Sequence, residues 1–341
     1  MIDGYGTESS PSQRPVPTAS TAKIMTAFLF LRHHPLRAGK QDPSFSVSAE
    51  EAARYPARVA NGESLIPVTA GQRFTERQAL EAILAISANN IADEVARWCS
   101  GSRDAFVTEM NQTAQHLGMG STTYTDPAGL DSGTVSTPAD QVKLFTAALQ
   151  VPEFATVAGT PVYSEPSGAR HANTNPLLGQ QGVFAGKTGT TTAAGKNLIL
   201  AAHRDIAGTS RLVVAAVMAQ PTSSSPTALQ ATAGTLLTAA DRSLVIAPVI
   251  RDGQTVARLD DGRGHTQPLI AAQDITATGR PGSTVKITIQ PGPTLPPGAP
   301  TGTPAAYAQA TNQPTDQAAV PLVTTVPVSH PSLIYRLTRT Q

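Results

Sequence analysis

The spacing of apolar residues changes along the chain, and this change constrains the fold more than any other feature. Between residues 20 and 149 apolar residues recur at the spacing of amphipathic helices, whereas residues 182–219 contain three short apolar runs that read as strands. The opening segment "MIDGYG" also reads as part of a strand. Strands before and after a block of helices are typical of an antiparallel sheet with helices on its faces, so the pattern predicts an α+β fold.

The helical half of the chain carries recognisable start signals. Thr75 and Gln78 have the spacing of a capping box, and Thr137 followed by Pro138 is a typical N-cap and first helical position. Helical segments are expected at residues 20–33, 75–98, 106–117 and 137–149.

A second, smaller domain is predicted from about residue 244. The segment "VIAPVIRDGQTVARLD" looks like two strands around Asp252 and Gly253, and "STVKITIQ" alternates with period two. Residues 291–318 are rich in Pro, Gly, Ala and Thr and are expected to form a flexible excursion, after which "SLIYRL" returns as a strand. The expected domains are therefore residues 1–243 and a β-rich domain of residues 244–341.

Composition excludes several classes of function. The formal charge is +1, from 25 basic and 24 acidic residues, so no field of one sign is available to attract nucleic acid or an anionic membrane. The single cysteine allows no internal disulfide. We see no apolar run long enough to span a bilayer and no secretory leader or membrane anchor, and we expect upstream residues to be absent from this chain.

Ser20 and Lys23, in "PTASTAKIMTA", are the first candidate site residues. Serine becomes a nucleophile when a base removes its proton, and lysine can be that base when burial and neighbouring positive charge lower its pKa. Residues i and i+3 lie on one face of a helix, so the amine reaches the hydroxyl. Serine is also a common N-cap, and Ser-x-x-Lys occurs by chance in chains of this length, so the pair alone also fits a helix cap beside a surface charge.

Two further motifs make the chemical interpretation specific. "SANN" provides Ser87 and Asn89 at a junction between helices, where side chains can point into a cleft. "KTG", at the end of an apolar strand, provides Lys187, Thr188 and Gly189. Each motif alone has a plain structural explanation, as a helix cap or a solvated lysine. Their order along the chain is that of the Ser-x-x-Lys, Ser-x-Asn and Lys-Thr-Gly set of penicillin-binding proteins and class A β-lactamases.

With these motifs the sequence resembles the D-alanyl-D-alanine carboxypeptidases, the low-molecular-mass serine penicillin-binding proteins that trim peptidoglycan. The resemblance extends to "SANNIADEVA", "LGMGSTTYTDPAGLD", "STPADQVKL" and "GKTGTTTAAGKNLILAA", and it covers roughly residues 14–220. It implies a β-lactamase/transpeptidase-like domain, in which an antiparallel sheet lies against a helical cluster.

The resemblance also implies roles for individual residues. Ser20 would attack the carbonyl between two D-alanines, Lys23 would take its proton, and Ser87 would pass that proton to the leaving amine. Asn89 would position Lys23 and the substrate amide.

Four residues of the strand would bind the substrate. Lys187, as a positive charge, and Thr188 would hold the terminal carboxylate. Gly189 would let the substrate backbone lie beside the strand, and the N–H of Thr190, with that of Ser20, would meet the oxyanion.

The sequence departs from the family at one position. The resemblance implies an arginine downstream of the Lys-Thr-Gly strand that helps bind the substrate carboxylate, but "MAQPTSSSPTALQ" contains none, and Arg211 has no evident place in that role. The expected balance between hydrolysis and transfer of the acyl group, the oligomeric state and the role of the C-terminal domain do not follow from the sequence.

Two alternative functions stay open. A class A-like β-lactamase would need a glutamate for deacylation, normally in Glu-x-x-Leu-Asn, and no such motif lies between Asn89 and Lys187; Glu165 reads as a loop residue. A non-catalytic wall-binding or β-lactam-sensing protein would keep the fold but lack a reactive serine. Penicillin turnover would favour the first, and absence of penicillin labelling the second.

The resemblance implies no cofactor and no metal. It implies that the partners are peptidoglycan stem peptides ending in D-Ala-D-Ala, with β-lactams as covalent inhibitors, and that the protein acts outside the cytoplasm at the cell envelope.

Overall fold

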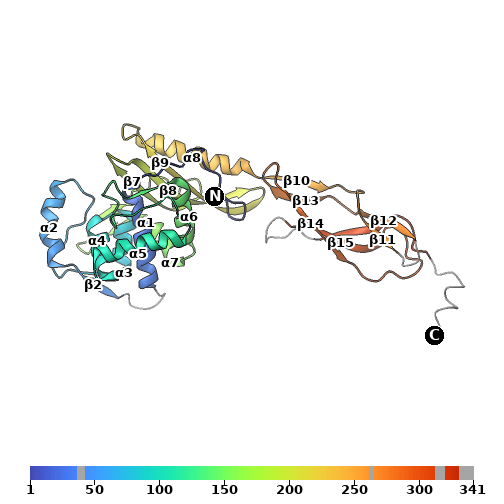
Figure 1. Cartoon of the computed structure of the whole chain (residues 1–341), viewed down its shortest axis with the longest axis horizontal. Helices are drawn as coiled ribbons and strands as arrows, with labels where there is room; N and C mark the ends of the chain where they lie inside the picture. Colours follow the sequence, from blue (N-terminus) through green and yellow to red (C-terminus); the bar gives the residue numbers. More distant parts are fainter. Residues whose placement is uncertain (37–42, 261–264, 312–318, 330–341) are drawn as a thin grey trace. The chain divides into compact units, whose positions relative to one another are not determined.

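The chain divides into two compact units (Figure 1). In this computed structural model, unit 1 comprises residues 1–205 and 209–240, and unit 2 comprises residues 206–208 and 241–341. The structure describes residues 1–36, 43–260, 265–311 and 319–329. The functional domain limits expected from the sequence, at residues 243 and 244, stay a prediction.

Unit 1 is built around a buried helix, α1, which follows the short 3₁₀ turn η1. Every residue of α1 from Lys23 to Leu31 is buried, because α3, α4, α5, α6 and α7 pack around it. The amphipathic pattern predicts that one face of this helix is exposed to solvent, and that prediction is wrong. Thr26 and the apolar residues beside it lie in the core as well. The helices are η1 Ala19–Ala22, α1 Lys23–His33, α2 Ala49–Ala60, α3 Glu76–Ala85, α4 Asn89–Ser100, α5 Arg103–His116, α6 Pro138–Leu149, α7 Pro152–Ala158 and α8 Pro226–Ser243.

The predicted helix starts are present. Thr75 and Gln78 form a complete capping box at α3, and the Thr137 side chain accepts the Asp140 N–H at α6. The sequence pattern missed α2 and α7. A proline inside the sequence of α2, Pro56, argues against a helix by the usual rules, and α7 is short.

The main sheet of unit 1 has the order β7-β8-β9, so β7 is an edge strand. β7 and β8 are antiparallel, with Thr188 opposite Leu198 and Thr190 opposite Lys196. The N-terminal segment expected to be a strand forms two isolated bridges, from Ile2 to Val213 of β9 and from Ile2 to Gly6. Three two-stranded pairs, β1-β4, β2-β3 and β5-β6, complete the unit. The strands are β1 Val16–Pro17, β2 Ser44–Ser46, β3 Arg73–Thr75, β4 Val135–Ser136, β5 Val162–Ser164, β6 Arg170–Ala172, β7 Val183–Thr191, β8 Gly195–Ile206 and β9 Thr209–Gln220.

Unit 2 is rich in β-strands, as the sequence predicts. It contains a five-stranded sheet of order β11-β12-β16-β15-β14 and a separate β10-β13 pair. β10 and β11, the two strands expected around Asp252 and Gly253, pair with β13 and β12 and not with each other. The strands are β10 Val245–Ile250, β11 Thr255–Asp260, β12 Thr266–Ala271, β13 Ile275–Gly279, β14 Lys286–Pro291, β15 Pro304–Thr311 and β16 Val320–Thr324.

The flexible excursion predicted at 291–318 is wrong over residues 304–311, which form β15. This strand pairs with β14 on one side and β16 on the other, and Ala306, Ala308 and Ala310 are buried in the core of unit 2. Pairing on both edges and burial of one face outweigh a composition poor in strand-forming residues. Residues 312–318 and the strand predicted from "SLIYRL" lie outside the described residues.

The loop between α5 and α6 is held rigidly against η1. Asp126 accepts the Leu130 N–H at 2.8 Å and the Thr134 hydroxyl at 2.7 Å. A Cβ at Gly129, which has φ +76, would lie 1.8 Å from the carbonyl oxygen of Ala19. Only glycine therefore fits where this loop crosses η1.

We predict that Gly129→Ala destabilises unit 1 and displaces the Ser20 segment. Gly101 is a matched control, since it has the same φ of +76 and nothing within 4 Å of an added Cβ. Both variants share a conformational cost of roughly 1–2 kcal/mol, and only Gly129→Ala adds a clash with backbone. Thermal unfolding of both variants tests this: a markedly lower midpoint is expected for Gly129→Ala alone, and equal midpoints would contradict it.

Candidate active site

Ser20 and Lys23 lie where η1 passes into α1. Ser20 is the second residue of η1 and is partly exposed, whereas Lys23 is the first residue of α1 and is completely buried. Ala19, just before the serine, has φ +46, a left-handed conformation that costs an ordinary residue roughly 1–3 kcal/mol. The nucleophile candidate thus sits on strained backbone with its base beneath it.

The Lys23 amine makes three contacts. Nζ lies 2.9 Å from Ser20 Oγ, 2.6 Å from Asn89 Oδ1 and 2.8 Å from the Ala128 carbonyl oxygen. Two of these partners are oxygens that can only accept. A neutral amine has two N–H donors and one lone pair, so it gives both protons to Asn89 and Ala128 and directs the lone pair at the Ser20 hydroxyl. This geometry suits a base that would take the serine proton.

Burial lowers the pKa of Lys23 to about 7. Asp126 and Asp93 oppose this shift, Arg58 adds to it and Glu63 opposes it. Desolvation therefore outweighs the nearby carboxylates. A pKa near the working pH leaves a large fraction of the amine neutral and able to act as a base.

Lys187 is the second buried amine of the site. It is 1% exposed, and its Nζ donates to the Thr188 carbonyl oxygen at 2.8 Å. Burial, and then the charge of Lys23, lower its pKa well below the ordinary value. The permanent ammonium expected from the sequence is thus one half of a coupled pair, in which charge on either amine disfavours charge on the other.

Ser87 and Asn89 lie at the tight corner before α4. Ser87 has φ +67, and its buried hydroxyl makes no hydrogen bond to any described residue. An unpaired buried hydroxyl on strained backbone is a feature of functional sites. Asn89 contacts Lys23 through Oδ1, and its Nδ2 donates to Glu63 at 3.1 Å.

β7 brings its Lys-Thr-Gly segment against η1. A Cβ on Gly189 would lie 2.8 Å from the Ser20 backbone nitrogen, so glycine is required for the close approach of β7 to η1. The Thr188 hydroxyl donates to Thr174 at 2.8 Å, and Thr190 is exposed at the end of the strand. The structure thus brings Ser20, Lys23, Asn89 and β7 together.

Sequence reasoning missed three contributors to this site. The Ala128 carbonyl binds Lys23, Glu63 binds Asn89, and Thr174 binds Thr188. The one sequence signal for Ala128 is the "PAGLD" segment, whose glycine allows the loop to cross η1. Nothing in the sequence pattern singles out Glu63 or Thr174.

The cation expected downstream of β7 is not Arg211. Arg211 lies near the start of β9, and its guanidinium is 4.7 Å from the centroid of the Tyr5 ring. The other end of β9, at Gln220, lies beside Gly195, the first residue of β8. Nine residues of strand span about 30 Å, which places Arg211 at the opposite end of the sheet from Thr190. Lys196 is the cation opposite Thr190 in the register, and it donates to the Ser224 carbonyl.

Neither a deacylating glutamate of the β-lactamase kind nor a metal site finds support in the described part of the chain. Glu165 accepts hydrogen bonds from His171 and Ser167 within its own hairpin. No group of three or more His, Cys, Asp and Glu side chains is placed to hold a metal ion among the described residues. No helix among them combines the length and apolar character of a membrane span.

The chain belongs to the D-alanyl-D-alanine carboxypeptidase family, whose model matches residues 7–222. Among curated relatives, D-alanyl-D-alanine carboxypeptidase DacB2 of Mycobacterium tuberculosis is 34% identical over 206 residues, which are 58% of this chain and 65% of that protein. D-alanyl-D-alanine endopeptidase of Haemophilus influenzae is 29% identical over 200 residues, 56% of this chain and 64% of that protein. The matched region therefore spans slightly less than two thirds of each relative.

Solved structures share the fold. The Streptomyces K15 DD-transpeptidase matches with a TM-score of 0.60 at 27% identity, covering 70% of this chain and 93% of that one. Penicillin-binding protein 5 of Haemophilus influenzae matches with a TM-score of 0.65 at 20% identity, covering 97% of this chain and 96% of that one. The likeness supports the predicted α+β fold, a transpeptidase-like domain with a β-rich C-terminal part.

We predict that the rate of serine acylation rises with pH around an apparent pKa of about 7, because Lys23 accepts a proton only when it is neutral. In Lys23→Arg the guanidinium stays protonated and cannot act as a base, so the acylation rate should fall at least about a hundredfold at every pH. Stopped-flow acylation by a β-lactam from pH 5 to 10 measures both. A pH-independent rate, or an active Lys23→Arg variant, would contradict the assignment of the base.

Proposed function

We propose that this protein is a serine-type D-alanyl-D-alanine carboxypeptidase that works through an acyl-enzyme on Ser20 and is acylated by β-lactams. One observation carries the proposal: the Lys23 amine, with a pKa lowered to about 7, is bonded so that its lone pair faces the Ser20 hydroxyl. Membership of the carboxypeptidase family and the names of the relatives support the reaction class.

In the acylation step Ser20 Oγ attacks the carbonyl between the two terminal D-alanines while Lys23 takes its proton. The oxyanion receives hydrogen bonds from the backbone N–H groups of Ser20 and Thr190. The C–N bond then breaks, and Ser87 relays the proton from Lys23 to the leaving amine. The hydroxyl of Ser87 suits this relay, since it makes no hydrogen bond to any of the described residues.

Recognition of the substrate carboxylate falls to Lys187 and Thr188. A carboxylate bound there favours the ammonium form of Lys187, and the coupling between the two amines then favours neutral Lys23. Substrate binding would in this way prepare the base. Asn89 positions the amine and, through its remaining N–H, the substrate amide.

Water completes the reaction by hydrolysing the ester on Ser20, with Lys23 again as base. The relatives include proteins named endopeptidase and transpeptidase, so the acceptor and the leaving group are the parts of the reaction that the family varies. We place the protein outside the cytoplasm at the cell envelope, where peptidoglycan stem peptides are its partners.

We predict that intact-protein mass spectrometry after incubation with benzylpenicillin shows one adduct of the full mass of the drug, since ring opening releases no fragment. Ser20→Ala should show none. Incubation with a peptide ending in D-Ala-D-Ala should release free D-alanine. An unlabelled wild-type protein would support a non-catalytic role, and fast turnover of penicillin would support a β-lactamase. Cleavage of cross-linked dimers without release of D-alanine from the peptide would support an endopeptidase.

We also predict strong preference for a free C-terminus. Replacing the terminal carboxylate of the peptide by an amide removes charge-assisted hydrogen bonds and should lower kcat/KM at least about tenfold. Thr188→Val, which removes only the hydroxyl, should lower kcat/KM for the acid more than for the amide. Equal cleavage of both peptides would contradict the assignment of the carboxylate site.

A further inference from the structure

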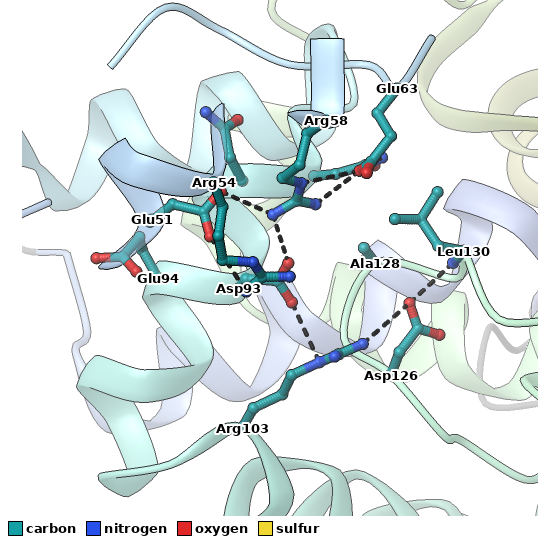
Figure 2. A network of polar contacts seen from close by, with 12 residues as sticks. Glu51, Arg54, Arg58, Glu63, Asp93, Glu94, Arg103, Asp126, Ala128 and Leu130 are labelled. Atoms are coloured by element: carbon teal, nitrogen blue, oxygen red, sulfur yellow. Dashed lines mark hydrogen bonds and ion pairs between the residues drawn. The ribbon is translucent and has the colours of Figure 1, made fainter. Parts of the chain in front are cut away.

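Arg58 lies at the centre of a network of ion pairs with Glu51, Glu63 and Asp93 (Figure 2). The guanidinium of Arg58, from α2, donates to Glu63 at 2.7 and 3.0 Å and, through Nη1, to Glu51 and Asp93 at 2.8 Å each. Burial acts to lower the pKa of Arg58, but the hydrogen bonds that it donates to Glu63 and the three carboxylate charges raise it above its ordinary value. Arg58 is therefore a fixed cation that orients Glu63.

The same oxygen of Glu63 that binds Arg58 also receives a hydrogen bond from Asn89. Nδ2 of Asn89 donates to Glu63 Oε2 at 3.1 Å, while Oδ1 of Asn89 lies 2.6 Å from Lys23 Nζ. A chain of direct contacts thus runs from Arg58 through Glu63 and Asn89 to the catalytic amine.

This contact decides which way the Asn89 amide faces. An ionised carboxylate only accepts, so the N–H₂ group must turn toward Glu63 and the carbonyl oxygen toward Lys23. The reversed amide would place its oxygen against the Glu63 carboxylate and its N–H donors against the amine. Lys23 would then give a proton elsewhere, or turn its lone pair to Asn89 and away from Ser20.

We propose that Glu63, held by Arg58, is a positioning residue that fixes the amide of Asn89 and thereby aims the lone pair of Lys23 at Ser20. This inference rests on the proposed role of Lys23 as the base. It assigns a catalytic purpose to a charge cluster that would otherwise count only as structural support.

The other two carboxylates that contact Arg58 also contact further arginines: Glu51 contacts Arg54 and Arg97, and Asp93 contacts Arg103. The Glu63 carboxylate, whose side chain is 13% exposed, contacts Arg58 and Asn89. Of the three carboxylates on Arg58, Glu63 is therefore the one placed to act on Asn89.

The pH dependence of Lys23 depends on all the charges that face it. These are Asp126 from the loop after α5, Asp93 from α4, Arg58 from α2, Glu63 from the loop after α2, and Lys187 from β7. The Glu63 charge raises the pKa of Lys23. Removing that charge should lower the pKa of Lys23 and so move the acid limb of the pH profile of acylation to lower pH. A lone pair no longer directed at Ser20 should instead lower the plateau rate of acylation.

Glu63→Leu tests the proposal. It removes the oxygen that accepts from both Arg58 and Asn89, so the Asn89 amide is no longer fixed. We expect the plateau rate of β-lactam acylation to fall at least about tenfold, because small misalignments of reacting groups have effects of this size. We also expect the acid limb to shift to lower pH.

Glu94→Leu is the matched control. Glu94 is a buried carboxylate in an ion pair with Arg97, and it accepts the Ser48 N–H and hydroxyl; among the hydrogen bonds of the described residues none joins it to Asn89. It should lower thermal stability about as much as Glu63→Leu and leave the acylation profile unchanged. Equal profiles for the two variants would overturn the proposal, because Glu63 would then act through stability alone.

A second variant keeps the test valid if Glu63→Leu does not fold. Glu63→Asp retains the charge but withdraws it from Asn89, so the plateau should fall while the acid limb stays in place. In an Asn89→Ala background Glu63→Asp should have no further effect on the plateau, and an undiminished effect there would overturn the proposal. Failure of the wild-type protein to acylate at Ser20 would instead defeat the proposed function itself.

Discussion

The site depends on the three contacts of one buried amine. Lys23 has no exposed surface, and its Nζ is surrounded by the Ser20 hydroxyl, the Asn89 side-chain oxygen and the Ala128 carbonyl. Burial removes the water that would keep the amine charged, and the two accepting oxygens take the protons of the neutral form. The same contacts that hold the side chain therefore also suit the proposed role of Lys23 as the base, with its lone pair directed at Ser20.

The fold supplies the rigidity that this arrangement needs. Ala19 and Ser87 both have positive φ, at +46 and +67, and each such residue costs roughly 1–3 kcal/mol. The cost is offset by α1, which is buried along most of its length, and by close approaches of Gly129 and Gly189 to η1. Tight packing around η1 and α1 thus stabilises the strained backbone at the site.

The sequence predicts the parts of this site that depend on residue type and local spacing. Lys23 could be named because a serine and a lysine at helical spacing leave a pattern in the chain, and Asn89 because it belongs to the Ser-x-Asn motif of the family that the sequence resembles. Ala128 could not, because it acts through a backbone carbonyl, and Glu63 could not, because its partner is distant in sequence. The same limit applies to the fold: the paired strands on either side made Pro304–Thr311 a strand despite its composition.

The ionisation state of Lys23 is the central claim, and NMR measures it directly. The chain has six lysines, so a sample with labelled lysine Cε and Nζ gives few signals, and Lys23→Arg identifies the one of interest. We predict that this signal titrates near pH 7 in the free protein. A signal that titrates at the ordinary value of 10.5 would mean that the amine is charged at neutral pH and cannot take the serine proton.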